Sequence, residues 1–122
     1  MAISRILVVD DSPTERFFLS ELLVKNGYLV SMAESGEEAV VQAKLTMPDL
    51  IVMDVVMPGR NGFQACRDLK SDDRCKDIPI ILCTSKGNES DKFWGQQQGA
   101  NGYIVKPFKG EDLLAAVKKV MS

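Results

Sequence analysis

Five polar side chains in this sequence come directly after short apolar runs, where buried strands would end. They are Asp10, Asp11, Asp54, Thr84 and Lys106. Carboxylates brought together repel one another, which raises their pKa values unless a cation is present. A hard divalent cation such as Mg²⁺ meets that need, because it prefers oxygen ligands. The ammonium of Lys106 and the hydroxyl of Thr84 would suit the oxygens of a phosphoryl group.

Asp54 is the first of these residues to examine. It follows the apolar run Leu50–Met53, which begins after Pro48 and is followed by the turn residues Pro58 and Gly59. A carboxylate is costly to bury without a partner, and open α/β sheets place their chemistry at the carboxyl ends of strands. A carboxylate can itself attack phosphorus to give an aspartyl phosphate. The pattern therefore favours phosphoryl chemistry at this strand end.

The elements that position these side chains alternate regularly. Apolar runs predict buried strands at residues 6–9, 28–32, 50–53, 78–83 and 103–105. Helical spacing predicts helices from Pro13 to just before Gly27, from the cap Ser35 to Pro48, around Phe63–Leu69, from the cap Asn88 to about Gln98, and from Glu111 to Met121. Strict alternation indicates a parallel sheet with helices on both faces. We expect an α/β, flavodoxin-like doubly wound fold with strand order 2-1-3-4-5, in which the polar residues open on one rim.

Helix caps and core faces are predicted in the same way. Ser12 with Glu15, and Ser35 with Glu38, match the capping-box pattern. Gly62 is expected at a bend or a close approach of two backbone segments. The residues expected to face the core are Phe18, Leu19, Leu22 and Leu23, then Ala39, Val40, Ala43 and Leu45, then Phe63, Cys66 and Leu69, and finally Leu113, Leu114, Val117 and Val120.

Composition restricts the classes of function. A chain of 122 residues has the size of one domain, and no apolar run approaches the length of a membrane span. The first residues lack a signal-peptide pattern, so we expect a cytoplasmic protein. The net charge of -2, with scattered Lys and Arg, disfavours nucleic-acid binding. Cys66, Cys75 and Cys83 occur without histidine or metal-type spacing, so we interpret them as packing residues.

Together these residues make the sequence resemble the response-regulator receiver domain over its whole length. The matching motifs are Asp10-Asp11, Asp54 with Met57-Pro58-Gly59 and Gly62, Thr84-Ser85, and Tyr103 with Lys106-Pro107-Phe108. The resemblance implies that Asp54 accepts a phosphoryl group from a histidine kinase. It also implies that Asp11, Asp54 and the carbonyl of Val56 bind Mg²⁺, and that Asp10 acts at the metal largely through water. Thr84 and Lys106 would contact the phosphoryl group, and the Lys106–Pro107 bond would be cis.

The resemblance implies a switch as well. The phosphoryl group would draw the Thr84 hydroxyl inward, and Tyr103 would turn into the space that it leaves. The surface of the fourth helix, fifth strand and fifth helix would then change. Its candidate contacts for an unknown output protein are Glu89, Lys92, Gln96 and Tyr103. Because the sequence ends at Ser122, we expect residues 1–122 to form a single, monomeric receiver domain without an output domain, a signalling module and not an enzyme that acts on other substrates.

The finer resemblance is to stand-alone receivers of chemotaxis-type systems, particularly those that control twitching motility by type IV pili. It rests on the stretches 11–15 and 91–95, and it implies a kinase of the chemotaxis type. Two residues depart from the family pattern. Val56 is apolar where the family often has an amide or acidic residue, and Lys86 stands two positions after Thr84. Both departures bear on the rate of dephosphorylation.

Two other classes use similar chemistry or a similar fold. A haloacid-dehalogenase-type phosphotransferase also has an aspartate nucleophile and Mg²⁺, but it would have a second Asp two positions after the first. Here Asp10 and Asp11 are adjacent, and Asp54 follows the third strand. A flavodoxin-like cofactor binder would have a hydroxyl-rich or glycine-rich first loop in place of the acidic pair. The receiver interpretation therefore accounts best for the motifs.

Overall fold

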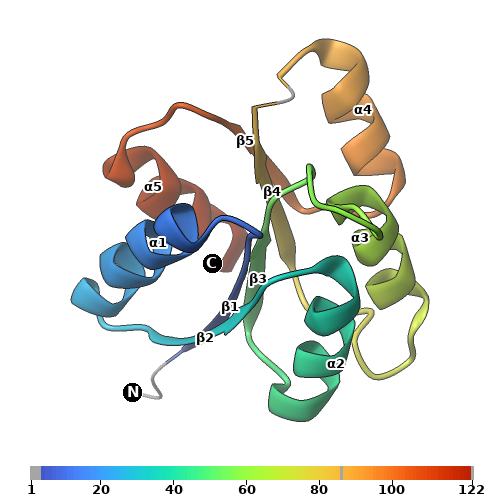
Figure 1. Cartoon of the computed structure of the whole chain (residues 1–122), viewed down its shortest axis with the longest axis horizontal. Helices are drawn as coiled ribbons and strands as arrows, with labels where there is room; N and C mark the ends of the chain where they lie inside the picture. The colour runs from blue at the N-terminus through green and yellow to red at the C-terminus, as the bar shows by residue number, and fades with distance from the viewer. Residues whose placement is uncertain (1–3, 86, 122) are drawn as a thin grey trace.

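The computed structural model of the chain describes residues 4–85 and 87–121, within which five strands and five helices alternate (Figure 1). The strands are β1 (Arg5–Val9), β2 (Leu29–Ala33), β3 (Leu50–Met53), β4 (Ile80–Thr84) and β5 (Gly102–Val105). The helices are α1 (Pro13–Lys25), α2 (Gly36–Thr46), α3 (Gly62–Ser71), α4 (Glu89–Gln97) and α5 (Gly110–Met121). All predicted element types are confirmed. The departure at Lys86 lies outside the described residues.

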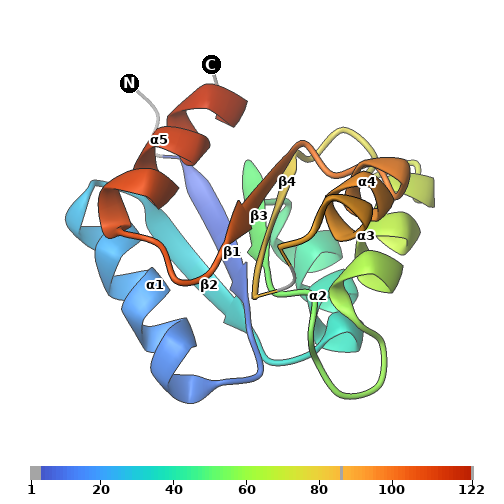
Figure 2. The same cartoon turned by 90° about the horizontal axis from the view of Figure 1, so that it is seen from above.

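The strands form one parallel sheet in the order β2-β1-β3-β4-β5, which confirms the predicted fold class. Helices α1 and α5 cover one face of the sheet, and α2, α3 and α4 cover the other (Figures 1 and 2). Strand order reverses between β1 and β3, so a crevice is expected at their carboxyl ends. Element boundaries differ from the prediction by one or two residues. For example, β4 begins at Ile80, just after Pro79, which has no N–H to donate.

The central strands are apolar throughout because helices cover both of their faces. Residues 6–9 of β1 and all of β3 are fully buried. Their side chains alternate between two core clusters, one on each face of the sheet. Leu7 and Met53 belong to one cluster, and Ile6 and Val52 belong to the other.

The predicted core faces are correct for α3 and largely correct for α5. Phe63, Cys66 and Leu69 are buried in α3, and Leu113 and Val117 are buried in α5. Leu114 and Val120 of α5 are partly buried and pack against one core cluster, as does Leu22 of α1. Val40 of α2 is partly buried and packs against the cluster on the other face of the sheet. Leu19, Leu23, Ala39 and Ala43 are buried as predicted.

Two predicted core residues are instead exposed. Phe18 is 51% exposed and Leu45 is 73% exposed. In α1, Leu19 and Leu23 lie one turn apart and pack against the sheet. Phe18 is rotated from Leu19 by about 100° around the helix axis, so it points away from the sheet. Phe18 lines a groove at the carboxyl edge of the sheet. Leu45 follows the buried Ala43 by two residues, about 200° around the helix, and so faces outward.

The two predicted capping boxes are only half formed. Ser12 Oγ accepts a hydrogen bond from Glu15 N, but Ser12 N donates to Asp10 Oδ1, so the Glu15 carboxylate does not close the box. In α2, Ser35 Oγ accepts from Glu38 N, while the Glu38 carboxylate accepts from the N–H before the cap residue. A complete capping box occurs at α3, between Asn61 and Gln64, where we had not predicted one.

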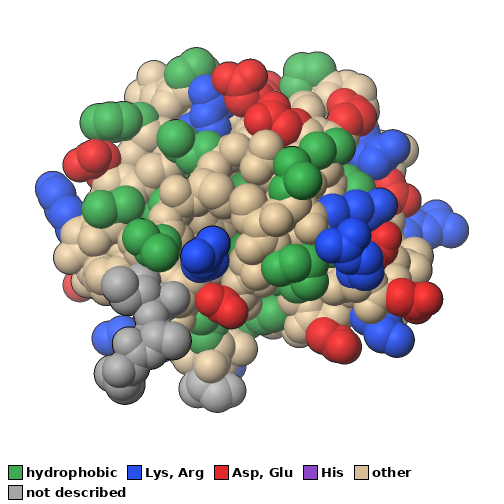
Figure 3. All heavy atoms as spheres, turned by 90° about the horizontal axis from the view of Figure 1, so that it is seen from below, with side chains coloured by type: hydrophobic (Ala, Val, Ile, Leu, Met, Phe, Trp, Pro, Cys, Tyr) green, Lys and Arg blue, Asp and Glu red, His purple; other side chains and the backbone are tan. Residues whose placement is uncertain are grey.

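The three cysteines are free and buried, as packing residues would be. Burial raises the pKa of Cys66 to about 11 and the pKa of Cys83 to about 12, so both thiols stay protonated at neutral pH. Within the described part of the chain, no helix has the length and apolar character needed to cross a membrane. Basic and acidic side chains are mixed on the face shown in Figure 3, with hydrophobic groups between them.

Candidate functional site

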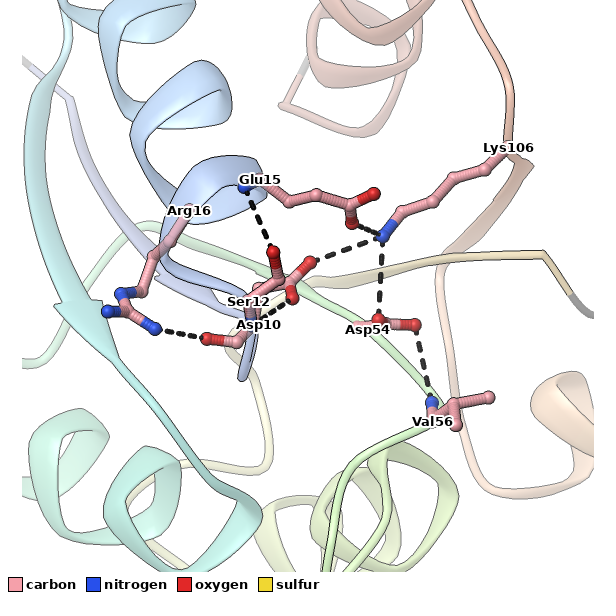
Figure 4. A network of polar contacts seen from close by, with 7 residues as sticks. All are labelled: Asp10, Ser12, Glu15, Arg16, Asp54, Val56 and Lys106. Atoms are coloured by element: carbon pink, nitrogen blue, oxygen red, sulfur yellow. Dashed lines mark hydrogen bonds and ion pairs between the residues drawn. The ribbon is translucent and has the colours of Figure 1, made fainter.

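The ammonium of Lys106 lies among three carboxylates at the carboxyl edge of the sheet (Figure 4). Its Nζ atom is 3.2 Å from Asp10 Oδ2 and 3.4 Å from Asp54 Oδ2. It also forms an ion pair and hydrogen bond with Glu15 Oε2. Asp10 follows β1, Asp54 follows β3 and Lys106 follows β5, whereas Glu15 lies in the first turn of α1. Residues from distant parts of the sequence therefore meet at one point.

The three carboxylates differ in burial. The Asp10 side chain is 1% exposed, whereas that of Glu15 is 45% exposed. Burial raises the pKa of Asp10, although the Ser12 N–H and Lys106 oppose this effect. The hydrogen bond from Lys106 lowers the pKa of Glu15. Burial alone would lower the pKa of Lys106, but the hydrogen bond with Glu15 and the charges of Asp54 and Asp10 outweigh it and raise that pKa.

Hydrogen bonds fix the loop between β1 and α1. Ser12 N donates to Asp10 Oδ1 at 2.9 Å, and Arg16 Nη1 donates to the Asp10 carbonyl at 2.7 Å (Figure 4). The other terminal nitrogen of Arg16 donates to Glu34 Oε1 at 3.1 Å, beyond the end of β2. The orientation of Asp10 is thus set by both its backbone and its side chain.

The backbone around Asp54 is held by α3. Val56 N donates to Asp54 Oδ1 at 3.3 Å, and Gly62 N donates to the Val55 carbonyl at 2.9 Å. A Cβ atom at Gly62 would come within 2.2 Å of the Asp54 carbonyl oxygen and 2.8 Å of Val55 Cα. Only a glycine fits there without displacing the backbone, which confirms the predicted close approach.

A groove opens beside the carboxylates. It combines the acidic cluster with aromatic and hydroxyl side chains, including Asp11, Phe18, Ser85, Pro107 and Phe108. The peptide bond between Lys106 and Pro107 is cis, as the resemblance implied. The site is therefore an acidic pocket with an apolar wall.

The predicted site residues occupy different positions relative to this groove. Asp10, Asp54 and Lys106 are brought into contact, as the strand order led us to expect. Asp11 is exposed and lines the groove. Thr84 is fully buried at the end of β4, and its carbonyl accepts a hydrogen bond from Lys106 N at 2.9 Å. The predicted role of the Val56 carbonyl stays a prediction, since the contact present is from the Val56 amide to Asp54.

Residues 6–118 match the family described as the response regulator receiver domain. The chain belongs to the response regulator receiver family. It is 47% identical over 119 residues to the protein PilH of Pseudomonas aeruginosa, with 98% of each chain covered. The receiver is therefore related over nearly its whole length to a protein of similar size.

Solved structures agree with this family assignment. The chemotaxis protein CheY4 of Vibrio cholerae has a TM-score of 0.93 at 35% identity, covering 98% of this chain and 99% of that one. The receiver domain of the sensor histidine kinase PA1611 from Pseudomonas aeruginosa PAO1 has a TM-score of 0.90 at 30% identity, covering 98% of each chain. The similarity to PilH and CheY4 confirms the resemblance to chemotaxis-type and pilus-type receivers.

A second region of the receiver carries the predicted output residues. Glu89, Lys92 and Gln96 are exposed on α4. Tyr103 on β5 is half-buried and packs against Gly95 of α4, where a Cβ atom would come within 3.0 Å of the tyrosine ring. Burial, followed by the charges of Asp91 and Asp54, raises the pKa of Tyr103 to about 12, so its hydroxyl stays protonated.

Glu15 is the site residue that the sequence analysis missed. We interpreted it as a capping residue, whereas its carboxylate contacts Lys106. Its position in the sequence could have indicated this contact. Glu15 lies in the first helical turn after Asp10-Asp11, and that turn begins at the rim of the sheet.

The oxygen atoms of this site suit a hard divalent cation. Asp10, Glu15 and Asp54 can each offer one oxygen, and these atoms all lie within 4.8 Å of one another. Asp11 adds a further carboxylate at the groove. Carboxylate oxygens are the donors that Mg²⁺ prefers, so the residues present fit the predicted ion.

Replacing Gly62 tests whether α3 supports the backbone of Asp54. Gly62→Ala should lower the free energy of unfolding by about 1–3 kcal/mol, because the added methyl group overpacks a backbone contact. Urea denaturation followed by circular dichroism measures this loss. Gly110→Ala is the matched control, since Gly110 also begins a helix and its Cβ would meet only the flexible end of Leu22. Equal stability of the two variants would contradict the close approach.

Proposed function

We propose that this receiver accepts a phosphoryl group on Asp54 from a histidine kinase of the chemotaxis type. The main support is the carboxylate of Asp54, which lies at the carboxyl end of β3 beside Lys106 and faces the groove. An oxygen of Asp54 would form a bond to phosphorus, and the bond from phosphorus to the donor would break. The electron pair of that bond leaves with the donor. Lys106 would neutralise charge on the phosphoryl oxygens, as cationic side chains do in phosphoryl transfer.

We assign Mg²⁺ to the carboxylates of Asp10, Asp11 and Asp54 and to the Val56 carbonyl, with Asp10 acting largely through water. When bound, this ion would supply positive charge next to the transferring phosphoryl group. The PA1611 receiver domain, which has a magnesium ion coordinated in its active-site cleft, supports the choice of ion. The chain's own part is to hold the nucleophile and the ammonium in fixed positions.

The phosphorylated state would be recognised on the surface of α4, β5 and α5. The hydroxyl of Thr84, at the end of β4, would donate a hydrogen bond to the phosphoryl group, and Tyr103 would turn inward. The exposed side chains of Glu89, Lys92 and Gln96 would contact an output protein. The packing of Tyr103 against α4 supports this route, because a turn of the ring changes the support of that helix.

A role in motility is the finer part of the proposal. The similarity to PilH and to the chemotaxis protein CheY4 supports chemotaxis-like control of twitching or another movement. Co-purification with output proteins under phosphorylating conditions, compared with Asp54→Ala, would test it. Recovery of partners outside motility would contradict this assignment.

Phosphorylation at Asp54 can be measured by intact mass. Incubation with Mg²⁺ and a small acyl-phosphate donor should add one phosphoryl group to the wild type and none to Asp54→Ala, because the nucleophile is missing. A chelator should abolish the addition. Asp112→Ala, which removes a carboxylate from α5, is the control and should be labelled normally. Equal labelling of Asp54→Ala would refute the assignment.

The lifetime of the aspartyl phosphate should depend on Val56. This side chain is exposed beside Asp54 and has no group that could orient an attacking water. Val56→Asn should therefore speed hydrolysis of the phosphorylated protein, whereas Val56→Ala should not. The decay can be followed by intact mass after the donor is removed. An unchanged or slower decay in Val56→Asn would contradict this expectation.

Trp94 is an exposed probe on α4 and the only tryptophan in the sequence. If the proposed output surface is correct, its emission should shift when Mg²⁺ and beryllofluoride, a phosphoryl mimic, are added together. The shift should vanish in Asp54→Ala and shrink in Thr84→Ala. Amide chemical shifts provide a second measurement. Chemical-shift changes confined to residues around Asp54, with α4 and β5 unaffected, would contradict the proposed output surface.

A further inference from the structure

The Glu15 carboxylate does not make the hydrogen bond of a capping box. A glutamate at the third helical position would accept a hydrogen bond from the N–H of the cap residue. Here Asp10 Oδ1 already accepts from Ser12 N, at 2.9 Å. The Glu15 carboxylate instead reaches across the groove to Lys106, which follows β5 on another part of the sheet rim.

The contact between Glu15 and Lys106 differs from the other two carboxylate contacts of Lys106. Asp10 is fully buried, and its position is set by Ser12 and Arg16. Glu15 is 45% exposed and reaches Lys106 through a longer, flexible side chain. Asp54 is 12% exposed and accepts a hydrogen bond from Val56 N. Of the three carboxylates, Glu15 is thus the one that can leave the ammonium without losing other hydrogen bonds of a buried side chain.

A phosphoryl group on Asp54 would compete for the same ammonium. It replaces the single negative charge of the carboxylate with about two negative charges and brings three acceptor oxygens at neutral pH. Lys106 Nζ is 3.4 Å from Asp54 Oδ2 in the unmodified protein, so it needs only a small movement to meet these oxygens. The Glu15 carboxylate would then face a second anion at close range, which is unfavourable.

We propose that Glu15 is a positioning residue that holds the Lys106 ammonium while Asp54 is unmodified and releases it when a phosphoryl group arrives. This inference rests on the proposed phosphorylation of Asp54 and adds a regulatory element to that site. The ion pair stabilises the unmodified state, so it opposes binding of the phosphoryl group. Glu15 thereby sets how readily the receiver becomes activated.

The experiment compares beryllofluoride binding by variants at saturating Mg²⁺. Glu15→Gln removes the charge at nearly constant volume and should tighten binding by roughly twofold to fivefold, the range expected for a partly exposed ion pair. Glu15→Asp keeps the charge but shortens the side chain by one methylene group, so it should also tighten binding. Glu21→Gln, six residues further along α1, is the matched control and should bind as the wild type does.

A second readout reports on Lys106 directly. The NMR signal of its ε-methylene group should move when beryllofluoride and Mg²⁺ bind to the wild type. In free Glu15→Gln the same signal should already be displaced from its position in the free wild type, whereas in free Glu21→Gln it should not. A purely structural role for Glu15 would not single out this group.

The outcomes separate the two proposals. If the wild type binds no beryllofluoride in the presence of Mg²⁺, the proposed function itself fails. If the wild type binds but Glu15→Gln binds equally or more weakly, only the role of Glu15 fails, and weaker binding would indicate a metal ligand instead. If Glu15→Gln tightens binding and Glu15→Asp behaves as the wild type, general charge repulsion and not the contact is responsible, and the inference is overturned.

Discussion

The ammonium group of Lys106 offsets the repulsion between carboxylates at the carboxyl edge of this sheet. Asp10 is buried and lies close to Asp54, and both contact Lys106. Removing one partner from a buried ion pair typically costs about 3–5 kcal/mol, because the remaining charge is left without compensation. The ends of β1, β3 and β5 are therefore joined by electrostatics as well as by the backbone ladder. The carboxylates of Asp10 and Asp54 can lie close together at the crevice because the Lys106 ammonium offsets their repulsion.

The charges at the site do not cancel. Three carboxylates surround one ammonium, which leaves two negative charges when all four groups are ionised. This surplus is equal in size to the charge of one divalent cation. Phosphorylation would then replace the single charge of the Asp54 carboxylate with about two, which would leave the cation-bound site with a net charge of about -1. Binding or loss of a cation or a phosphoryl group can therefore be accommodated by movement of the Lys106 and Glu15 side chains, without rearrangement of the buried strands.

The fold and half of the site could be predicted because they follow from strand ends. Parallel strands bring their carboxyl ends to one edge, so Asp10, Asp54 and Lys106 could be brought together from sequence order alone. The role of Glu15 could not be predicted, because it depends on which carboxylate accepts from Ser12 N. The exposure of Phe18 depends on the rotation of α1 against the sheet, to which a sequence pattern is insensitive within about one residue.

The contact between Gly95 and Tyr103 limits how this sequence can change over time. A Cβ atom at position 95 would lie 3.0 Å from the ring of Tyr103 and 3.3 Å from the nearest Leu82 atom. A bulkier residue at position 95 would require the Tyr103 ring or α4 to shift, unless the residue at position 103 became smaller. Among descendants of this protein, the two positions should therefore vary together, although they lie on different elements and neither is charged.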